Sequence, residues 1–270
     1  MTTHVGMSLG GMLGYLSYYK AAEESSGDSE INGVQPHASA KVNSIFKEVI
    51  SKINGKVGYV CIYLNKNYGN EIRKKFVEEG LKIGFKNVEI INFLTILYLI
   101  PMSKVNYKPL NGNVIWIKYS SIYLPHNIYV WQINGTKAKF IGEWKADVSK
   151  LSDLENVMNE SKLNKGPDVV LSANNIDRAN ISKISPDCQF FTFNFAESRY
   201  SKECLLKARI TAGDQDLVHL NVINFLSYKI TLTYDGKRIK YFNIGQHLPV
   251  YYCQKLFKNS NNDMLKIVTD

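Results

Sequence analysis

Residues 58–101, GYVCIYLNKNYGNEIRKKFVEEGLKIGFKNVEIINFLTILYLIP, decide the fold class of this chain. The run from Tyr59 to Leu64 is rich in β-branched and aromatic residues, which predicts a strand. Asn65, Asn67 and Gly69 follow it and are typical of a turn. The stretch therefore opens with a strand that ends in a short polar connection.

An amphipathic helix is predicted after this connection. Apolar residues recur at helical spacing from Glu71 onward, with charged residues between them, and Gly84 is typical of a helix end. Residues 88–91 predict a second strand, and residues 95–100 predict a second short helix. Two strands joined by a crossover helix favour parallel pairing, so the sequence predicts an α/β sheet with helices packed on its faces.

Around this stretch, five further segments follow the order of the ATPase domain of the seventy-kilodalton heat-shock chaperones. They are HVGMSLGGMLGYLSYYK (4–20), NGNVIWIKYSSIYLPHNIYVWQINGTKAKFIGEW (111–144), DVVLSANNIDRANI (168–181), FNFAESRYSKECLLKARITAGD (193–214) and residues 217–257. The last segment resembles the start of the family's peptide-binding β-domain, with Leu248 and Pro249 at its Leu-Pro position. The chain thus resembles this family, and most of all its atypical, ribosome-associated branch.

The resemblance implies an α/β, actin-like (ribonuclease H-like) two-lobed ATPase-domain fold with reduced subdomains. Residues 1–112 would form the first lobe, residues 113–215 the second, and residues 216–270 a truncated, peptide-binding-like β segment. Only residues 21–58 and 145–167 stand where the family carries large subdomains. We therefore expect the base of each lobe to be present and the walls of the cleft to be reduced.

Two local patterns add to this organisation. Residues 25–40 are polar and contain Gly and Ser, which predicts a surface connector. Asp235 and Gly236 stand between two strand-like runs and predict a hairpin turn.

The family's nucleotide-binding positions are altered in this sequence. Such an ATPase needs carboxylates to organise Mg²⁺, and glycines that let backbone N–H groups reach the phosphates. The resemblance places Ser8 and Lys118 at the two phosphate-loop aspartates and Phe93 at a conserved glutamate. The other vestigial positions in these motifs are Gly6, Gly10, Gly11, Ser120, Ser121, Ala173 and Asn174. We therefore predict a pseudo-ATPase with no catalytic or metal-binding residues, which takes ATP and Mg²⁺ only if the degenerate cleft still binds them.

Composition excludes several classes. The chain is 45% hydrophobic and 21% charged, as is ordinary for a globular protein. Its most apolar stretch, residues 93–100, is too short to span a bilayer, and the N-terminus has no secretory pattern. The four cysteines form no CxxC pair and the five histidines have no ligand-like spacing, so we expect reduced thiols and no zinc. These features predict a cytosolic protein without a membrane partner.

The net charge of +9 leaves two interpretations open. A basic surface could bind RNA, for example in the ribosome. However, only five of the 33 basic residues are Arg, which also fits a general bias toward Lys in the composition. Arg73, Lys74 and Lys75 lie between the apolar positions of the predicted helix and are interpreted as a solvated face.

The leading functional hypothesis is a divergent chaperone or co-chaperone that binds protein and does not turn over ATP. The resemblance implies unfolded or nascent polypeptide as its partner, together with a J-domain co-chaperone and the ribosome. Two alternatives stay open. One is a weak ATP-binding chaperone; the other is a non-catalytic actin-like scaffold remnant or a basic RNA-binding or ribosome-binding module.

Overall fold

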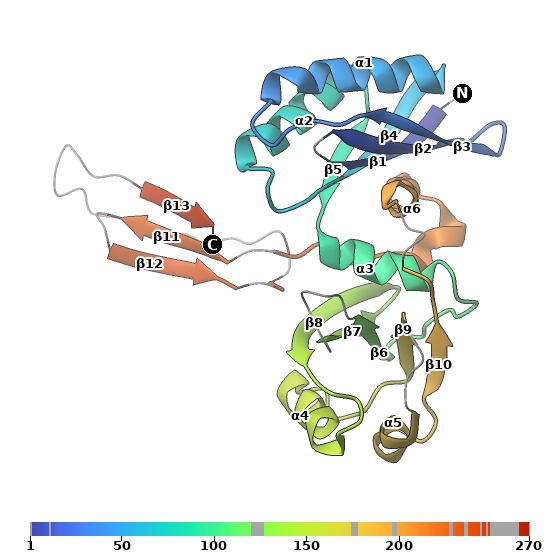
Figure 1. Cartoon of the computed structure of the whole chain (residues 1–270), viewed down its shortest axis with the longest axis vertical. Helices are drawn as coiled ribbons and strands as arrows, with labels where there is room; N and C mark the ends of the chain where they lie inside the picture. Colours follow the sequence, from blue (N-terminus) through green and yellow to red (C-terminus); the bar gives the residue numbers. More distant parts are fainter. Residues whose placement is uncertain are drawn as a thin grey trace.

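The computed structural model describes most of the chain (Figure 1). The described residues are 2–10, 12–119, 127–173, 178–195, 199–226, 229–234, 237–243, 245–246, 248 and 265–269. Four predicted site residues, Gly11, Ser120, Ser121 and Asn174, lie outside them, as do Pro249 and the predicted hairpin turn at Asp235 and Gly236.

The first half of the chain builds a five-stranded mixed sheet. Its strands are β1 (Thr2–Leu9), β2 (Leu13–Lys20), β3 (Ser25–Asn32), β4 (Lys56–Leu64) and β5 (Asn87–Ile91). Its helices are α1 (Val42–Ile53), α2 (Asn70–Lys82) and α3 (Phe93–Met102), with a 3₁₀ turn at Ser39–Lys41. The spatial order is β3-β2-β1-β4-β5, with β4 parallel to both β1 and β5. The parallel unit predicted for residues 58–101 is confirmed.

The second half repeats this plan. Its strands are β6 (Val114–Tyr119), β7 (Asn127–Asn134), β8 (Lys137–Lys145), β9 (Val169–Ser172) and β10 (Gln189–Thr192). Its helices are α4 (Leu151–Ser161), α5 (Arg178–Ile184) and α6 (Ser201–Thr211). The order β8-β7-β6-β9-β10 matches that of the first sheet, strand for strand. The sequence shows no internal repeat, so the shared strand order of the two sheets is visible only in the three-dimensional structure.

Each half sends its last helix to the junction between the two sheets (Figure 1). Helix α6, from the second half, packs on β1 and β4 of the first sheet. Helix α3, from the first half, buries Tyr98 against Trp131 of β7, with ring centroids 4.9 Å apart. Helices α1 and α2 cover the outer face of the first sheet, and α4 and α5 cover that of the second. Because α6 packs on the first sheet and α3 on the second, the two sheets share one hydrophobic core.

A small antiparallel sheet follows, in the order β12-β11-β13, and extends away from the other two sheets in Figure 1. Its strands are β11 (Ile230–Tyr234), β12 (Lys237–Phe242) and β13 (Leu265–Thr269). The chain reaches it through a 3₁₀ segment, Gln215–Leu220, and then pairs Val222 with Ala138 of β8. The prediction of a short β segment after two α/β halves is confirmed.

Two local predictions were wrong. Residues 25–40 are not simply a connector, because β3 occupies Ser25–Asn32 and hydrogen-bonds to β2. The strand was not predicted because its sequence is polar. An edge strand whose side chains mostly face solvent needs few apolar residues. Arg73 does not belong to a solvated face, because its guanidinium donates hydrogen bonds to three backbone carbonyls, as described below.

In the part of the chain that the structure describes, no helix is long and apolar enough to cross a membrane.

Candidate functional site

The first phosphate-loop segment forms the hairpin between β1 and β2. Ser8, which the resemblance places at an aspartate position, is 8% exposed and lies between Tyr15 of β2 and Tyr63 of β4 in the sheet register. The amide of Gly10 donates to the carbonyl of Leu13 at 3.1 Å and closes the hairpin. Two tyrosines therefore flank the position at which the resemblance would place a metal-organising carboxylate.

Gly6 has a packing role in this hairpin strand. A Cβ at this position would lie 2.1 Å from the backbone nitrogen of Leu205 in α6. Only a residue without a side chain lets the helix backbone approach the strand this closely. Whether Gly6 also contacts a nucleotide stays a prediction.

The second half brings Lys118 and Ala173 to neighbouring strand ends. Lys118 lies on β6 in register with Ser172, the last residue of β9, and Ala173 comes directly after it. Both residues are half-buried. The role of these positions in binding nucleotide stays a prediction.

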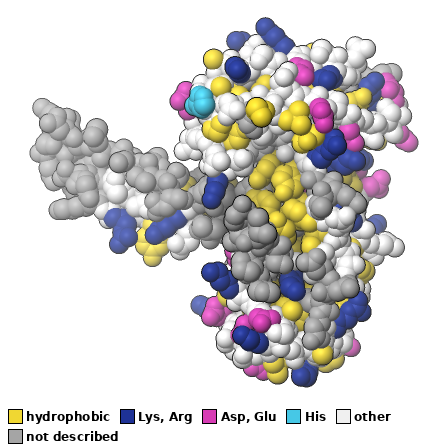
Figure 2. Space-filling model, in the orientation of Figure 1, with side chains coloured by type: hydrophobic (Ala, Val, Ile, Leu, Met, Phe, Trp, Pro, Cys, Tyr) yellow, Lys and Arg dark blue, Asp and Glu magenta, His cyan; other side chains and the backbone are white. Residues whose placement is uncertain are grey.

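Aromatic rings from four separate segments meet at the junction between the two sheets. We call Tyr63, Phe93, Tyr119, Phe195 and Tyr200 the junction cluster. Its ring centroids lie 4.5 Å apart for Tyr119 and Phe195, 5.2 Å for Tyr63 and Tyr200, and 5.9 Å for Phe93 and Tyr119. All five side chains are partly exposed, and Figure 2 shows hydrophobic side chains gathered at this junction.

The environment of the junction cluster disfavours charge. Burial raises the pKa of Tyr119, and burial together with the nearby Tyr119 and Glu203 raises the pKa of Tyr200 to about 12. Both phenols therefore stay neutral at physiological pH. Within the described ranges, no group of three His, Cys, Asp or Glu side chains could hold a metal ion.

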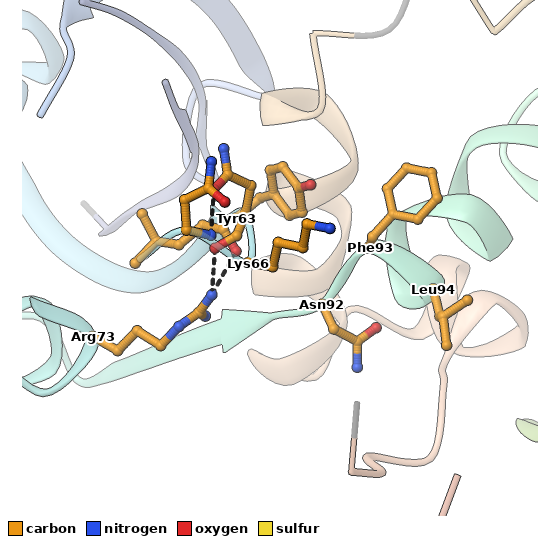
Figure 3. A pocket seen from close by; sticks show the side chains of 9 residues that line it. Tyr63, Lys66, Arg73, Asn92, Phe93 and Leu94 are labelled. Carbon is orange, nitrogen blue, oxygen red and sulfur yellow. Dashed lines mark hydrogen bonds between the residues drawn. The ribbon is translucent and has the colours of Figure 1, made fainter. Parts of the chain in front are cut away.

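A cavity of about 440 Å³ opens beside the junction cluster, at the carboxyl ends of β4 and β5 (Figure 3). Phe93 and Tyr63 belong to both features. The lining residues are Tyr63, Leu64, Asn65, Lys66, Asn67, Arg73, Asn92, Phe93 and Leu94. In Figure 3, Lys66 extends from the loop after β4 toward the side of the cavity formed by Asn92 and Phe93.

Hydrogen bonds hold the walls of this cavity. Arg73 of α2 donates to the carbonyls of Leu64, Asn65 and Tyr68 at 2.9, 2.7 and 2.9 Å. The Asn65 side chain accepts from the amide of Asn67 at 2.9 Å, so the loop is closed from within. The sequence shows the turn residues of this loop, but the inward direction of Arg73 depends on the packing of α2 against the sheet.

The other wall begins at Asn92, whose side-chain oxygen accepts from the amide of Thr95 at 2.8 Å and caps α3. Sequence reasoning identified Phe93 as the replacement for a family glutamate, but it did not predict that Phe93 would join four other rings. Ring contacts between segments that are far apart in the chain leave no local pattern.

Comparisons with known proteins bear on the fold. No family model matches the sequence, and no curated protein matches it. Among solved structures, a ROK family transcriptional regulator, a homologue of the E. coli MLC protein, aligns with a TM-score of 0.51 and 10% identity. The alignment covers 81% of this chain and 79% of that one. At this identity the likeness shows the fold alone.

Two further structures align more weakly. An inorganic polyphosphate/ATP-glucomannokinase from Arthrobacter aligns with a TM-score of 0.41 and 9% identity, over 78% of this chain and all of that one (100%). A Bacteroides thetaiotaomicron protein with an actin-like ATPase fold and unknown function aligns with a TM-score of 0.39 and 11% identity, over 75% and 95% of the two chains. At these TM-scores, neither similarity supports a conclusion about this chain.

None of the three structures named here is a heat-shock chaperone, so the narrower resemblance stays a prediction. The chain has the α/β, actin-like ATPase fold that its sequence predicted, followed by a small separate antiparallel sheet.

Proposed function

We propose that this chain is a non-hydrolysing protein of the actin-like ATPase fold that acts by binding other polypeptides. The observation that carries the proposal is the junction cluster. It places five partly exposed aromatic rings where the two halves of the fold meet. Neighbouring aromatic side chains that stay partly exposed can serve as a site of protein interaction.

The loss of hydrolysis follows from the chemistry of the altered positions. Transfer of a phosphoryl group from ATP needs bound Mg²⁺ and donors aimed at the phosphates. Ser8 and Lys118 supply no carboxylate at the two family aspartate positions, and Lys118 adds a positive charge where a cation would have to sit. Phe93 replaces the third acidic position with a ring. We therefore propose that ATP and Mg²⁺ are not part of the activity.

Polypeptide is the partner class that fits the junction cluster best. Unfolded or nascent chains expose aromatic and aliphatic side chains, which gain free energy by leaving water for an apolar surface. The resemblance to the seventy-kilodalton chaperones supports the same partner, and it adds a J-domain co-chaperone, the ribosome and a cytosolic location as proposals.

A peptide titration tests this proposal. A fluorescein-labelled peptide rich in Leu and Phe is expected to bind saturably in an anisotropy assay. Phe195→Ser should weaken binding about tenfold, the effect of losing about 1.4 kcal/mol of apolar contact. Leu110→Ser is the matched control, because Leu110 is 73% exposed and is not part of the cluster. Absence of binding, or equal loss in both variants, would contradict the proposal.

A thermal melt with saturating Mg-ATP tests the loss of nucleotide binding separately. Ligand at 100 times its dissociation constant stabilises a protein by about 2.7 kcal/mol, which moves the midpoint of a chain of this size by roughly 2–4 °C. We expect no shift of the melting midpoint. We also expect no phosphate release when the protein is incubated with Mg-ATP. A clear shift that persists in Lys66→Gln would favour the alternative of a weak ATP-binding chaperone.

A second candidate function, nucleic-acid binding, is favoured by the small C-terminal sheet. The side chains of Lys229 and Arg238 lie 5.5 and 5.8 Å from the ring of Tyr241, which is 48% exposed. An exposed ring with two cations close to it can stack on a base while the cations contact phosphates. Binding of single-stranded RNA that weakens steeply with salt, and that Tyr241→Ala reduces, would support this candidate.

A further inference from the structure

We infer that the cavity beside the junction cluster is a binding site for a small organic anion with a flat ring. The cavity shares Tyr63 and Phe93 with the junction cluster, but the inference rests on the charge and shape of its own lining. The volume of about 440 Å³ lies within the range of about 300–1,000 Å³ that is usual for ligand pockets. No described residue of the β1–β2 hairpin lines the cavity, although Ser8 lies in register with Tyr63, which does.

The charge of the lining selects the class of ligand. Among the described residues that line the cavity, Lys66 and Arg73 are the charged ones, and none of them carries a carboxylate. Arg73 directs Nε and Nη2 at backbone carbonyls of the loop, which leaves the ammonium of Lys66 as the group placed to meet a ligand. Two positive charges, with no negative charge among the described lining residues, favour an anion.

The rest of the lining selects the shape of the ligand. Tyr63, Phe93 and Leu94 offer apolar surface, and the rings can stack on a flat ring of the ligand. The carboxamides of Asn65, Asn67 and Asn92 stand beside that surface and can donate hydrogen bonds to oxygen acceptors. Apolar area with a few polar groups that fix orientation is the usual design of a small-molecule site.

The site is formed before any ligand arrives. The bonds from Arg73 to three carbonyls and the bond between Asn65 and Asn67 fix the loop, and Tyr68 donates to the carbonyl of Val34 at 2.7 Å. Across the cavity, the cap from Asn92 to Thr95 fixes the start of α3. Fixed walls lower the entropy that binding would otherwise cost.

Ligand-observed NMR titration with three probes tests the inference. Phenyl phosphate and benzoate share a ring and differ in the anionic group, and benzyl alcohol is the uncharged analogue. At least one anion is expected to bind saturably, and the one that binds more tightly identifies the phosphate or carboxylate class. Lys66→Gln should weaken that binding by about tenfold or more, because a charge-assisted contact is lost.

Lys74→Gln is the matched control, since Lys74 is an exposed residue of α2 that lies 3.6 Å from Glu78 and does not line the cavity. It should leave the affinity within about twofold, because exposed ion pairs contribute little. The inference is overturned if neither anion saturates, if benzyl alcohol binds as tightly as the anions, or if the two lysine variants lose affinity equally. A melt of each variant confirms that it is folded.

Discussion

Gly6 of β1 and Leu205 of α6 are in direct backbone contact, 199 positions apart in the chain (205 minus 6). A Cβ on Gly6 would lie 2.1 Å from the Leu205 nitrogen and 2.1 Å from the carbonyl oxygen of Ser201. The side chain of Ser201 strengthens this contact, because its hydroxyl is hydrogen-bonded to that of Ser17 in β2 at 2.9 Å. Helix α6 is therefore seated on the first sheet by backbone packing and by a buried polar contact.

Gly6→Ala is expected to destabilise the fold by about 3 kcal/mol or more, because a helix backbone cannot move aside as a flexible side chain does. Gly55→Ala is the control, since its Cβ would meet its nearest neighbour, the Thr3 hydroxyl, at an ordinary 3.5 Å. The free energy of unfolding of Gly55→Ala should stay within about 1 kcal/mol of that of the wild type. Urea denaturation measures both; equal stabilities would disprove the close approach of α6.

Tyr98→Phe is expected to stabilise the protein by about 1 kcal/mol. Tyr98 is fully buried against Trp131, and its hydroxyl has no hydrogen-bond partner among the described residues. Removing a buried hydroxyl that makes no bond removes a desolvation cost. Tyr68→Phe should have the opposite sign, with a loss of about 1 kcal/mol, because Tyr68 donates to the carbonyl of Val34 at 2.7 Å. Thermal and urea melts compare the stabilities of the two variants. If both variants are stabilised, or both destabilised, the prediction is wrong.

Lys207→Met is expected to cost about 3 kcal/mol. The Lys207 ammonium lies 3.6 Å from the Glu89 carboxylate and 3.4 Å from three oxygens of residues 221–224, and its side chain is 6% exposed. Removing it leaves a largely buried carboxylate without its cation. Glu89→Gln in the same background should restore part of the loss.

Lys202→Met supplies the comparison from the same helix. Lys202 lies 3.2 Å from Asp28, but the two side chains are 69% and 51% exposed, so the change should cost less than about 1 kcal/mol. Denaturant melts measure the stabilities of Lys207→Met, of its combination with Glu89→Gln, and of Lys202→Met. Similar losses of stability for Lys207→Met and Lys202→Met would mean that the buried pair has no special role.

His4→Gln is expected to flatten the fall in stability on acidification. Burial and then the positive charge of Arg209 lower the pKa of His4 below its usual value, and its Nδ1 accepts from the amide of Tyr59 at 3.4 Å. The unfolded chain therefore takes up this proton more readily than the folded one, so stability decreases as pH falls below about 6.5. Urea melts between about pH 7 and pH 5 measure the slope. The exposed His37 provides the control, as His37→Gln, and an unchanged slope in His4→Gln would contradict the expectation.

Much of the fold could be predicted from local patterns. The alternation and periodicity of residues 58–101 predicted β4, α2, β5 and α3, and the structure confirms all four. Strand β3 was missed because an exposed edge strand carries few apolar residues. Arg73 was misread because its position on the helix shows only that it lies outside the apolar stripe. The carbonyls that it reaches belong to the loop after β4.

The sequence by itself determined the α/β class and the order of the main elements, and the resemblance predicted the loss of acidic residues at Ser8, Lys118 and Phe93. These properties are local, because residue type and short-range spacing carry them. Only the tertiary structure decided that the two halves share one strand order, that α3 and α6 each pack on the sheet of the other half, and that five rings and a cavity lined by Lys66 and Arg73 lie together at the junction. These features arise from contacts between segments far apart in the chain, where each residue must fit a neighbour that its own stretch of sequence does not specify.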